Sequence, residues 1–272
     1  MLTGTGDMMV AVCITGKNKS RSTLQIIKNT PAKSYGPGPV DLIVNYGLPM
    51  KRLETFLRKN PRANRVPILN RYIGRPKHLA ISDAVNEGVL CPETCLTLPK
   101  RAKLSSWIEK RMHSSCGRGI REARQKTPMQ GKYYQQMISN RRFEIRVHCF
   151  SWLPKDQWQI QKRVGPKDQI AWNFHQGGHF QRVHTPLNFK VFKDSLDIAE
   201  KILKIRHMNF GAVDLIVTDD YKIHFIEINS CPGFTELSAP IYFDAITGLT
   251  KMTKAEVKKF KIVFVYTYYS SN

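Results

Sequence analysis

The spacing of apolar residues changes near residue 104, and this change constrains the fold more than any other feature of the sequence. Before it, short apolar runs at Met8–Ile14 and Val40–Asn45 alternate with amphipathic stretches at Ser20–Lys28 and Pro49–Lys59. Strands that alternate with helices are typical of a layered α/β unit with a parallel sheet. The sequence therefore predicts a small N-terminal α/β domain, followed by a helix over Arg75–Gly88.

After residue 104 the predicted strands are longer. Alternating apolar residues predict strands at 104–109, 132–138, 143–150, 157–164, 210–217 and 221–229. Helical spacing predicts helices at 194–207 and 253–264, and places Leu79, Ile81, Ala84 and Val85 near one face of the earlier helix. The last two strands flank Asp219-Asp220, which predicts a hairpin.

Composition argues against several classes of protein. Apolar residues make up 42% of the 272 residues, and no apolar run approaches the roughly 20 residues needed to span a bilayer. Asp7 precedes the first apolar run, so this run predicts a strand rather than a signal peptide. The six cysteines are scattered, and Cys91 and Cys95 lack the spacing and the partner pair of a zinc site. We therefore expect a cytoplasmic protein with reduced cysteines and no membrane contact.

The net charge of +22 is large and unevenly distributed. Residues 51–150 contain 22 Lys and Arg against 7 Asp and Glu, so most of the excess lies there. A basic surface attracts polyanions, whether a nucleotide, a nucleic acid or an acidic polymer. Charge alone says nothing about the fold and leaves these partners open.

Oxygen-bearing side chains gather on the last two predicted strands. Glu227 and Asn229 are two residues apart and therefore point to the same face, and Asp214 on the neighbouring strand can reach that face. Two carboxylates and an amide are hard ligands that suit magnesium. The alternative is a solvated polar face. Glu227 follows Phe225-Ile226, where a buried carboxylate would be costly without a cation, and this favours a metal site.

A second motif combines a strand lysine with a turn rich in glycine and serine. Lys110 ends the run Trp107-Ile-Glu-Lys110, and Ser115, Gly117 and Gly119 follow it. Such a turn can present backbone N–H groups to an anion, and glycine lets the backbone approach a phosphate closely. A plain hairpin turn explains the glycines alone equally well.

Two further segments carry polar residues among apolar ones. In Tyr133–Ile138, apolar side chains can enclose an adenine while Gln135 or Gln136 hydrogen-bonds it. Arg146 is placed to meet a phosphate as a bidentate donor, although a β-hairpin in which it pairs with Glu144 is equally consistent. Asn173 and His175 precede Gly177-Gly178, and a lone histidine there is more often a surface or packing residue than a catalyst.

Taken in order, these segments resemble the ATP-grasp superfamily over most of residues 66–250. Lys110–Gly119 is similar to the family's strand lysine and flexible phosphate loop, and Gln135–Ile138 to its adenine-binding hinge. Glu144-Ile-Arg-Val resembles its Glu-x-Arg-Val strand, and Asp214 with Glu227-Ile-Asn229 resembles its magnesium triad. Asn173–Gly178 resembles a segment of the ribosomal-protein glutamate ligase branch.

The sequence departs from the family pattern at two places. Glutamines replace the acidic residues of the hinge, which changes the expected adenine or ribose contacts but not the pocket. Ala171 and Trp172 stand where the glutamate ligase branch carries an arginine, so the amino-acid substrate of that branch is not carried over.

The resemblance implies an α/β (α+β) fold and an enzymatic activity. We expect an N-terminal domain at 1–70 and an ATP-grasp domain at 71–272, with a central subdomain at 71–140 and a C-terminal subdomain at 141–272, which sandwich ATP. The implied activity is ATP-dependent, ADP-forming carbon–nitrogen ligation, with Mg²⁺ (or Mn²⁺) as cofactor. It needs a carboxylate and an amine, and the basic region suggests an acidic or peptide substrate. The rivals are a basic nucleic-acid-binding or assembly protein on an inactive scaffold, and a small-molecule kinase.

The resemblance also assigns roles to individual residues. The implied nucleotide-binding residues are Lys77, Lys110, Ser115, Gly117, Gly119, Gln135, Gln136, Met137 and Ile138. The implied metal ligands are Asp214, Glu227 and Asn229. The implied catalytic residues are Arg146, Asn173 and His175.

Overall fold

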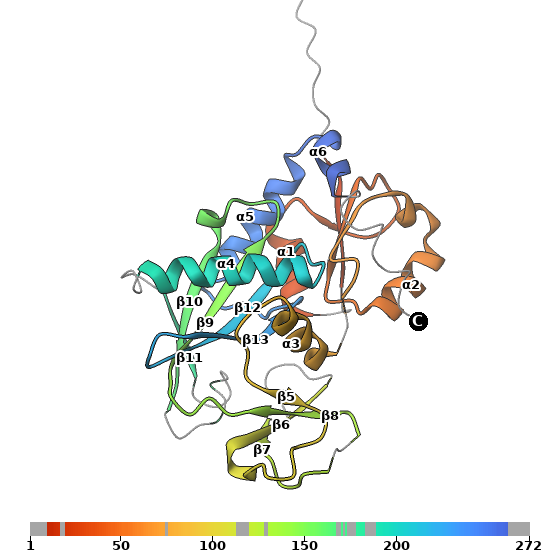
Figure 1. Cartoon of the computed structure of the whole chain (residues 1–272). Helices are drawn as coiled ribbons and strands as arrows, with labels where there is room; N and C mark the ends of the chain where they lie inside the picture. Colours follow the sequence, from red (N-terminus) through yellow and green to blue (C-terminus); the bar gives the residue numbers. More distant parts are fainter. Residues whose placement is uncertain are drawn as a thin grey trace, which may run out of the picture.

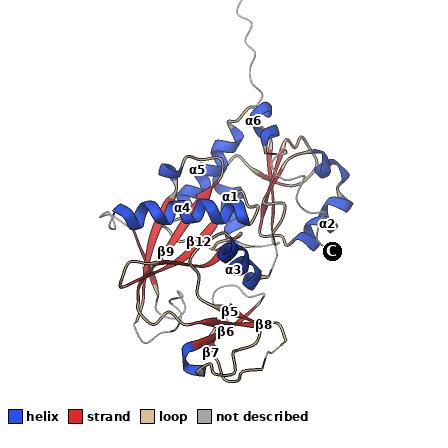
Figure 2. Ribbon diagram, in the orientation of Figure 1, coloured by secondary structure: helices blue, strands red, loops and turns tan. Residues whose placement is uncertain are grey.

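The computed structural model describes residues 10–16, 20–73, 76–112, 120–127, 130–166, 170, 172, 178–182 and 189–260. In this part, three β-sheets follow one another along the chain (Figures 1 and 2). We call them the N-terminal, central and C-terminal sheets. The central sheet lies opposite the C-terminal sheet, at the bottom of Figure 1, and the N-terminal sheet lies to one side.

The N-terminal sheet is parallel, as predicted. Its strand order is β2-β1-β3-β4. The strands are β1 (Val12–Gly16), β2 (Lys33–Ser34), β3 (Leu42–Tyr46) and β4 (Ile68–Leu69), with helices α1 (Arg21–Asn29) and α2 (Met50–Lys59) and the 3-10 turn η1 (Pro61–Arg65). All of β3 is buried, because helices cover both faces of the sheet. Ile43 packs with Leu53 and Leu57 of α2, whereas Val44 joins the main core of the molecule.

The central sheet is small and antiparallel, with strand order β5-β8-β6-β7. Helix α3 (Lys77–Asn86) leads into it, and its elements are β5 (Thr94–Cys95), η2 (Leu104–Ser106), β6 (Trp107–Arg111), β7 (Arg121–Glu122) and β8 (Lys132–Gln136). Strand alternation divides β6: Trp107 packs in a small core with Leu98 and Tyr134, while Ile108 and Lys110 point toward the C-terminal sheet.

The C-terminal sheet is antiparallel, with strand order β11-β10-β9-β12-β13. Its elements are β9 (Arg141–Phe150), η3 (Lys155–Gln157), β10 (Gln159–Val164), β11 (His179–Arg182), α4 (Phe189–Ile205), β12 (Phe210–Thr218), β13 (Ile223–Asn229), α5 (Ala239–Thr250) and α6 (Lys254–Lys259). Strands β12 and β13 form the predicted hairpin. Helix α4 lies across one face of the sheet (Figure 1). None of the helices in the described residues has the length and apolar character needed to cross a membrane.

The structure corrects several predicted details. The predicted residues Ile81 and Ala84 do lie on the packed face of α3, but Val85 is 53% exposed and Ala80 is buried beside them. Helix α4 begins five residues earlier than predicted, at Phe189. Helix α5 has no predicted counterpart, because apolar residues occur around most of its circumference and hide the helical period. The predicted segments at 8–14 and 253–264 extend partly outside the described residues.

One buried asparagine joins the N-terminal unit to the C-terminal sheet. The backbone N–H of Asn70 donates to Asn209 Oδ1 at 2.8 Å, and Asn70 Oδ1 accepts from the N–H of Asn209 at 2.8 Å. Asn70 Nδ2 also donates to the carbonyl of Phe210, while Asn45 Nδ2 donates to the carbonyl of Asn70, each at 2.9 Å. Asn70 has φ 54°, a conformation that asparagine tolerates better than most residues. This junction fixes where the two units meet.

Candidate functional site

Three charged side chains form one row across the C-terminal sheet. Arg146 on β9 lies opposite Asp214 on β12, and Asp214 lies opposite Glu227 on β13. Residues that are directly opposite on antiparallel strands point to the same face, which explains why these groups meet. Arg146 donates from Nε to Asp214 Oδ1 at 2.6 Å and from Nη2 to Oδ2 at 2.7 Å. The bidentate pair holds Asp214 in one orientation.

Asn229 completes the predicted metal set. Its Nδ2 lies 3.4 Å from Asp214 Oδ2 and 3.2 Å from Glu227 Oε1, so the three side chains converge on one point. Turning the amide over would present its oxygen there beside the two carboxylates. Two carboxylates and one amide oxygen fit Mg²⁺, which binds few protein ligands and keeps waters and phosphate oxygens. Because its third ligand is an asparagine, this set is not a cluster of His, Cys, Asp or Glu side chains. The described residues contain no group of three or more such side chains that could hold a metal ion.

Both carboxylates are ionised at neutral pH. Burial alone would raise the pKa of Asp214, but the guanidinium groups of Arg146 and Arg163 outweigh it and hold that pKa well below its usual range. Burial likewise opposes ionisation of Glu227, whereas the nearby ammonium group of Lys77 lowers its pKa. The two acids therefore present negative charge at the point where Asn229 meets them.

Two lysines approach the same point from the central part of the chain. Lys77, the first residue of α3, donates from Nζ to Glu227 Oε2. Lys110 on β6 is 5% exposed and donates from Nζ to Gln135 Oε1 at 2.8 Å. Burial lowers the pKa of Lys110, and the negative charge of Glu227 partly offsets that shift. Gln135 Nε2 reaches Thr94 Oγ1 at 3.3 Å, so the Gln135 amide is engaged with protein groups at both ends.

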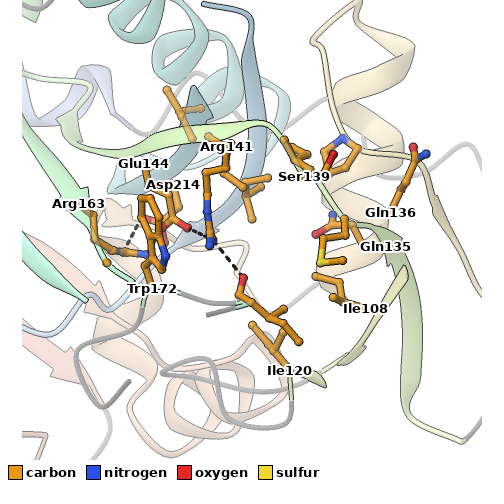
Figure 3. Close-up of a pocket in the computed structure, with 18 of the residues that line it drawn as sticks. Ile108, Ile120, Gln135, Gln136, Ser139, Arg141, Glu144, Arg163, Trp172 and Asp214 are labelled. Atoms are coloured by element: carbon orange, nitrogen blue, oxygen red, sulfur yellow. Dashed lines mark hydrogen bonds and ion pairs between the residues drawn. The ribbon is translucent and has the colours of Figure 1, made fainter. Parts of the chain in front are cut away.

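A cleft of about 660 Å³ separates the central and C-terminal sheets, and Figure 3 shows its lining. One end is formed by Ile108, Ile120 and the chain from Gln136 to Ser139. The other end is charged and contains Arg141, Glu144, Arg163 and Asp214. Of the predicted site residues, the lining includes Lys110, Gln135, Gln136, Met137, Ile138, Asp214 and Glu227. Arg146, Asn229 and Lys77 contact this lining through Asp214 and Glu227.

The charged end contains an ion-pair cluster of Arg141, Glu144 and Arg163, which the sequence alone did not predict. Arg163 Nη1 donates to Glu144 Oε2 at 2.7 Å, and Arg141 Nη1 donates to Glu144 Oε1 at 3.0 Å. The alternative that Glu144 pairs with Arg146 is therefore wrong, because Arg146 binds Asp214. Arg163 follows Gln161 by two residues on β10, so strand alternation could have indicated that it shares the face of the site.

The Trp172 ring stacks on the guanidinium group of Arg141. The guanidinium carbon of Arg141 lies 3.9 Å from the centre of the Trp172 ring, and the indole N–H donates to the carbonyl of Pro166 at 2.7 Å. Gly165 and Gly178 allow this placement, since a Cβ on either would approach Trp172 within 2.6 Å and 2.2 Å respectively. The predicted residues Asn173, His175, Ser115, Gly117 and Gly119 lie outside the described residues.

The buried residue His148 lies two residues after Arg146 on β9 and therefore points to the same face of the sheet. His148 Nδ1 is 3.0 Å from the Tyr242 hydroxyl, and Nε2 is 3.3 Å from Gln161 Oε1. A neutral ring satisfies both contacts when Nε2–H donates to Gln161 and Nδ1 accepts from Tyr242. Burial, reinforced by the charge of Arg146, lowers the pKa of His148 to about 3.

This histidine should make the folded chain sensitive to acid. An unfolded histidine has a pKa near 6.5, so between about pH 6.5 and pH 3 the unfolded chain binds one more proton at this position. Stability is therefore lost as the pH falls through that window, by about 1.4 kcal/mol per pH unit from this group. Urea unfolding at several pH values should show a shallower dependence for His148→Gln than for the unmodified chain. The exposed control His179→Gln should keep the original dependence, and equal curves for all three proteins would contradict the assignment.

Comparison with solved structures identifies the fold. The macrocyclase MdnC from Microcystis aeruginosa, bound to its precursor peptide MdnA, superposes with TM-score 0.56 at 17% identity, covering 90% of this chain and 100% of that one. The D-alanine–D-alanine ligase from Bacillus anthracis complexed with ATP superposes with TM-score 0.61 at 12% identity, covering 93% of this chain and 99% of that one. The ATP-grasp ligase PsnB, with Mg and ADP, superposes with TM-score 0.58 at 12% identity, covering 89% of this chain and 99% of that one. This chain has the ATP-grasp fold.

The ATP-grasp fold predicted from the sequence resemblance is thus confirmed in three dimensions. No protein-family model matches the sequence, and the search of curated proteins found no match. The assignment of the ATP-grasp fold therefore rests on the three-dimensional similarity to these structures.

Proposed function

We propose that this ATP-grasp chain is an ATP- and Mg²⁺-dependent ligase that joins a carboxylate to an amine through an acyl phosphate. The observation that carries the proposal is the convergence of Asp214, Glu227 and Asn229 beside two lysines and an arginine, at the wall of one cleft. The superposed structures of PsnB with Mg and ADP, and of the Bacillus anthracis enzyme with ATP, support the same choice of ligands.

The two ends of the cleft suit the two ends of a nucleotide. Ile108, Met137 and Ile138 offer apolar surface to a purine ring, and the exposed amide of Gln136 is available to its polar edge. Lys110 lies between this end and the carboxylates, where its ammonium group can bind phosphate oxygens. The positive charges around Glu227 and Asp214 therefore lie where the triphosphate would extend.

The proposed reaction has two steps. A substrate carboxylate oxygen attacks the γ-phosphorus of ATP, and the bond from that phosphorus to the bridging oxygen of ADP breaks. The amine nitrogen then attacks the carbonyl carbon of the acyl phosphate, the carbon–oxygen bond to phosphate breaks, and the amine loses a proton. Arg163 lines the cleft beside Asp214, where it can bind the phosphoryl oxygens and offset negative charge. Arg146 would act through its bidentate pair with Asp214.

The metal ligands have a distinct task. Asp214, Glu227 and Asn229 would hold Mg²⁺, which when bound supplies Lewis-acid stabilisation of phosphate charge. Asp214 keeps its orientation through Arg146, and Glu227 through Lys77. Enclosure of the cleft by the two sheets would protect the acyl phosphate from water.

The direct test compares Glu227→Gln with the unmodified chain. Substitution removes one negative charge from the metal site with little change in shape. We expect the unmodified chain to bind Mg·ATP and to hydrolyse it slowly without a second substrate. The variant should lose activity on the order of a hundredfold or more, because even residues outside the first ligand shell of a metal cost 10–100-fold. Isothermal titration and phosphate release measure the two quantities.

A matched control is Glu87→Gln, which alters an exposed glutamate at the end of α3. It should bind and hydrolyse Mg·ATP like the unmodified chain. Absence of any Mg·ATP response in the folded, unmodified protein would overturn the catalytic proposal. A stable phosphorylated product with no amide in a carboxylate–amine screen would indicate a kinase instead.

A further inference from the structure

The outer surface of the N-terminal unit carries a basic face that does not line the cleft. Helix α2 packs on the N-terminal sheet through Leu53 and Leu57, with Phe56 partly buried beside them. The other side of α2 and the following turn η1 carry six basic residues and one acidic residue, Glu54. We call the basic residues the α2–η1 face: Lys51, Arg52, Arg58, Lys59, Arg62 and Arg65, all exposed.

Ion pairs within the described residues do not explain most of these charges. Arg65 has an interaction within the chain, which leaves five cations to be explained. Among the described residues, no ion pair involves any of those five. None of them lines the cleft between the sheets. The proposed ligase chemistry therefore leaves this positive charge unused.

The position of two of these residues opposes helix stability. Lys51 and Arg52 lie in the first turn of α2, which has no acidic residue and no side-chain cap. The N-terminus of a helix carries a partial positive charge, so each cation there destabilises the helix. Arg58 and Lys59 in the last turn are favourable to the helix and need no other explanation. The first-turn cations point to a partner outside the chain.

We propose that the α2–η1 face binds the phosphate backbone of a nucleic acid. Figure 1 shows α2 at the periphery of the molecule, on the side of the N-terminal sheet away from the C-terminal sheet. Ten helical residues extend about 15 Å, and a helix of about 10–12 Å diameter matches the roughly 12 Å major groove of a duplex. Three of the five remaining cations are arginines (Arg52, Arg58 and Arg62), whose planar fork binds phosphate bidentately.

The geometry disfavours insertion into a membrane. An interfacial helix needs an apolar face that can enter lipid, but Leu53 and Leu57 are 1% and 6% exposed and belong to the protein core. The contacts that remain are electrostatic and polar. Binding should therefore be independent of base sequence and should weaken steeply with salt.

The test uses a fluorescein-labelled, mixed-sequence DNA duplex of twenty base pairs and the full chain. Anisotropy titrations between 50 and 200 mM NaCl give the affinity and its salt dependence. The triple variant Arg52→Glu/Arg58→Glu/Arg62→Glu should bind at least tenfold more weakly. Its logarithmic salt slope should fall by about 3, because each lost phosphate contact removes about 0.9.

The control Lys193→Glu/Lys251→Glu/Lys259→Glu changes the net charge equally at exposed positions on and beside α4 and α6. It should bind the duplex within about twofold of the unmodified chain. Both triple variants should keep the unmodified unfolding temperature and Mg·ATP binding, so this test stands or fails separately from the ligase proposal.

Three outcomes would overturn the proposal. The first is no duplex binding at 50 mM NaCl. The second is an equal loss in both triple variants, which would indicate a general effect of net charge. The third is displacement of the duplex by poly-L-glutamate at equal charge concentration, which would indicate a surface for acidic polypeptides.

Discussion

The Lys110→Met variant is expected to bind ATP about 30-fold more weakly than the unmodified chain, yet to unfold at the same temperature or a higher one. Lys110 is 5% exposed, and the hydrogen bond of its ammonium group at 2.8 Å goes to the neutral amide of Gln135. Burying a cation without a bonded anion costs free energy, so the unliganded fold does not gain from this charge. A hydrogen bond from a charged group to a phosphate contributes about 2 kcal/mol, which corresponds to the expected loss.

Calorimetric titration with Mg·ATP and thermal unfolding without ligand measure the two effects separately. Methionine keeps the apolar stem of the side chain, so the variant should retain its packing. The control Lys103→Met changes an exposed lysine of the same subdomain and should alter neither quantity. A Lys110→Met protein that binds ATP normally but unfolds at a much lower temperature would show that Lys110 is structural.

The Asn70→Ala variant should destabilise the folded chain by about 4 kcal/mol. Removing the side chain leaves the backbone N–H of Asn209 and the carbonyl of Phe210 without their partner, in a site where Asn70 is fully buried. Each unsatisfied buried group costs about 1–3 kcal/mol. Alanine at φ 54° adds roughly 1–2 kcal/mol of backbone strain. The urea concentration at the midpoint of unfolding, with its slope, gives the difference.

Two further variants separate the causes. Asn70→Gly relieves the strain but not the lost hydrogen bonds, so its stability should lie between that of Asn70→Ala and that of the unmodified chain. Asn86→Ala, at an exposed position on α3, should change stability by less than about 0.5 kcal/mol. An Asn70→Ala protein as stable as the Asn86→Ala control would contradict the role assigned to this junction.

Part of the site could be predicted because it depends on local rules. Glu227 and Asn229 share a face since strands have a period of two, and the hairpin of β12 and β13 brings Asp214 opposite Glu227. The same rule turns Lys110 toward the cleft while Trp107 enters the core. These placements follow from a few neighbouring residues and one tight turn.

The partners of those residues could not be predicted in the same way. Lys77 meets Glu227 across 150 positions of sequence, and Arg146 meets Asp214 across 68. The sequence offers Glu144 as a candidate partner of Arg146, but the register of β9 with β10 places Glu144 opposite Arg163. Such contacts depend on strand order and register across the sheet, about which periodicity gives no information.

The sequence by itself therefore determined the kinds of most elements, though not helix α5, together with the face of the site strands that bears polar groups and the groups able to bind a cation. Only the tertiary structure decided that α3, the central sheet and the C-terminal sheet bring those groups to one cleft, and that Trp172 and Arg141 close one end of it. The physical reason is the range of the interactions. Backbone geometry and side-chain alternation act between neighbours, whereas ion pairs, buried amides and stacked rings form between segments that only the complete fold brings together.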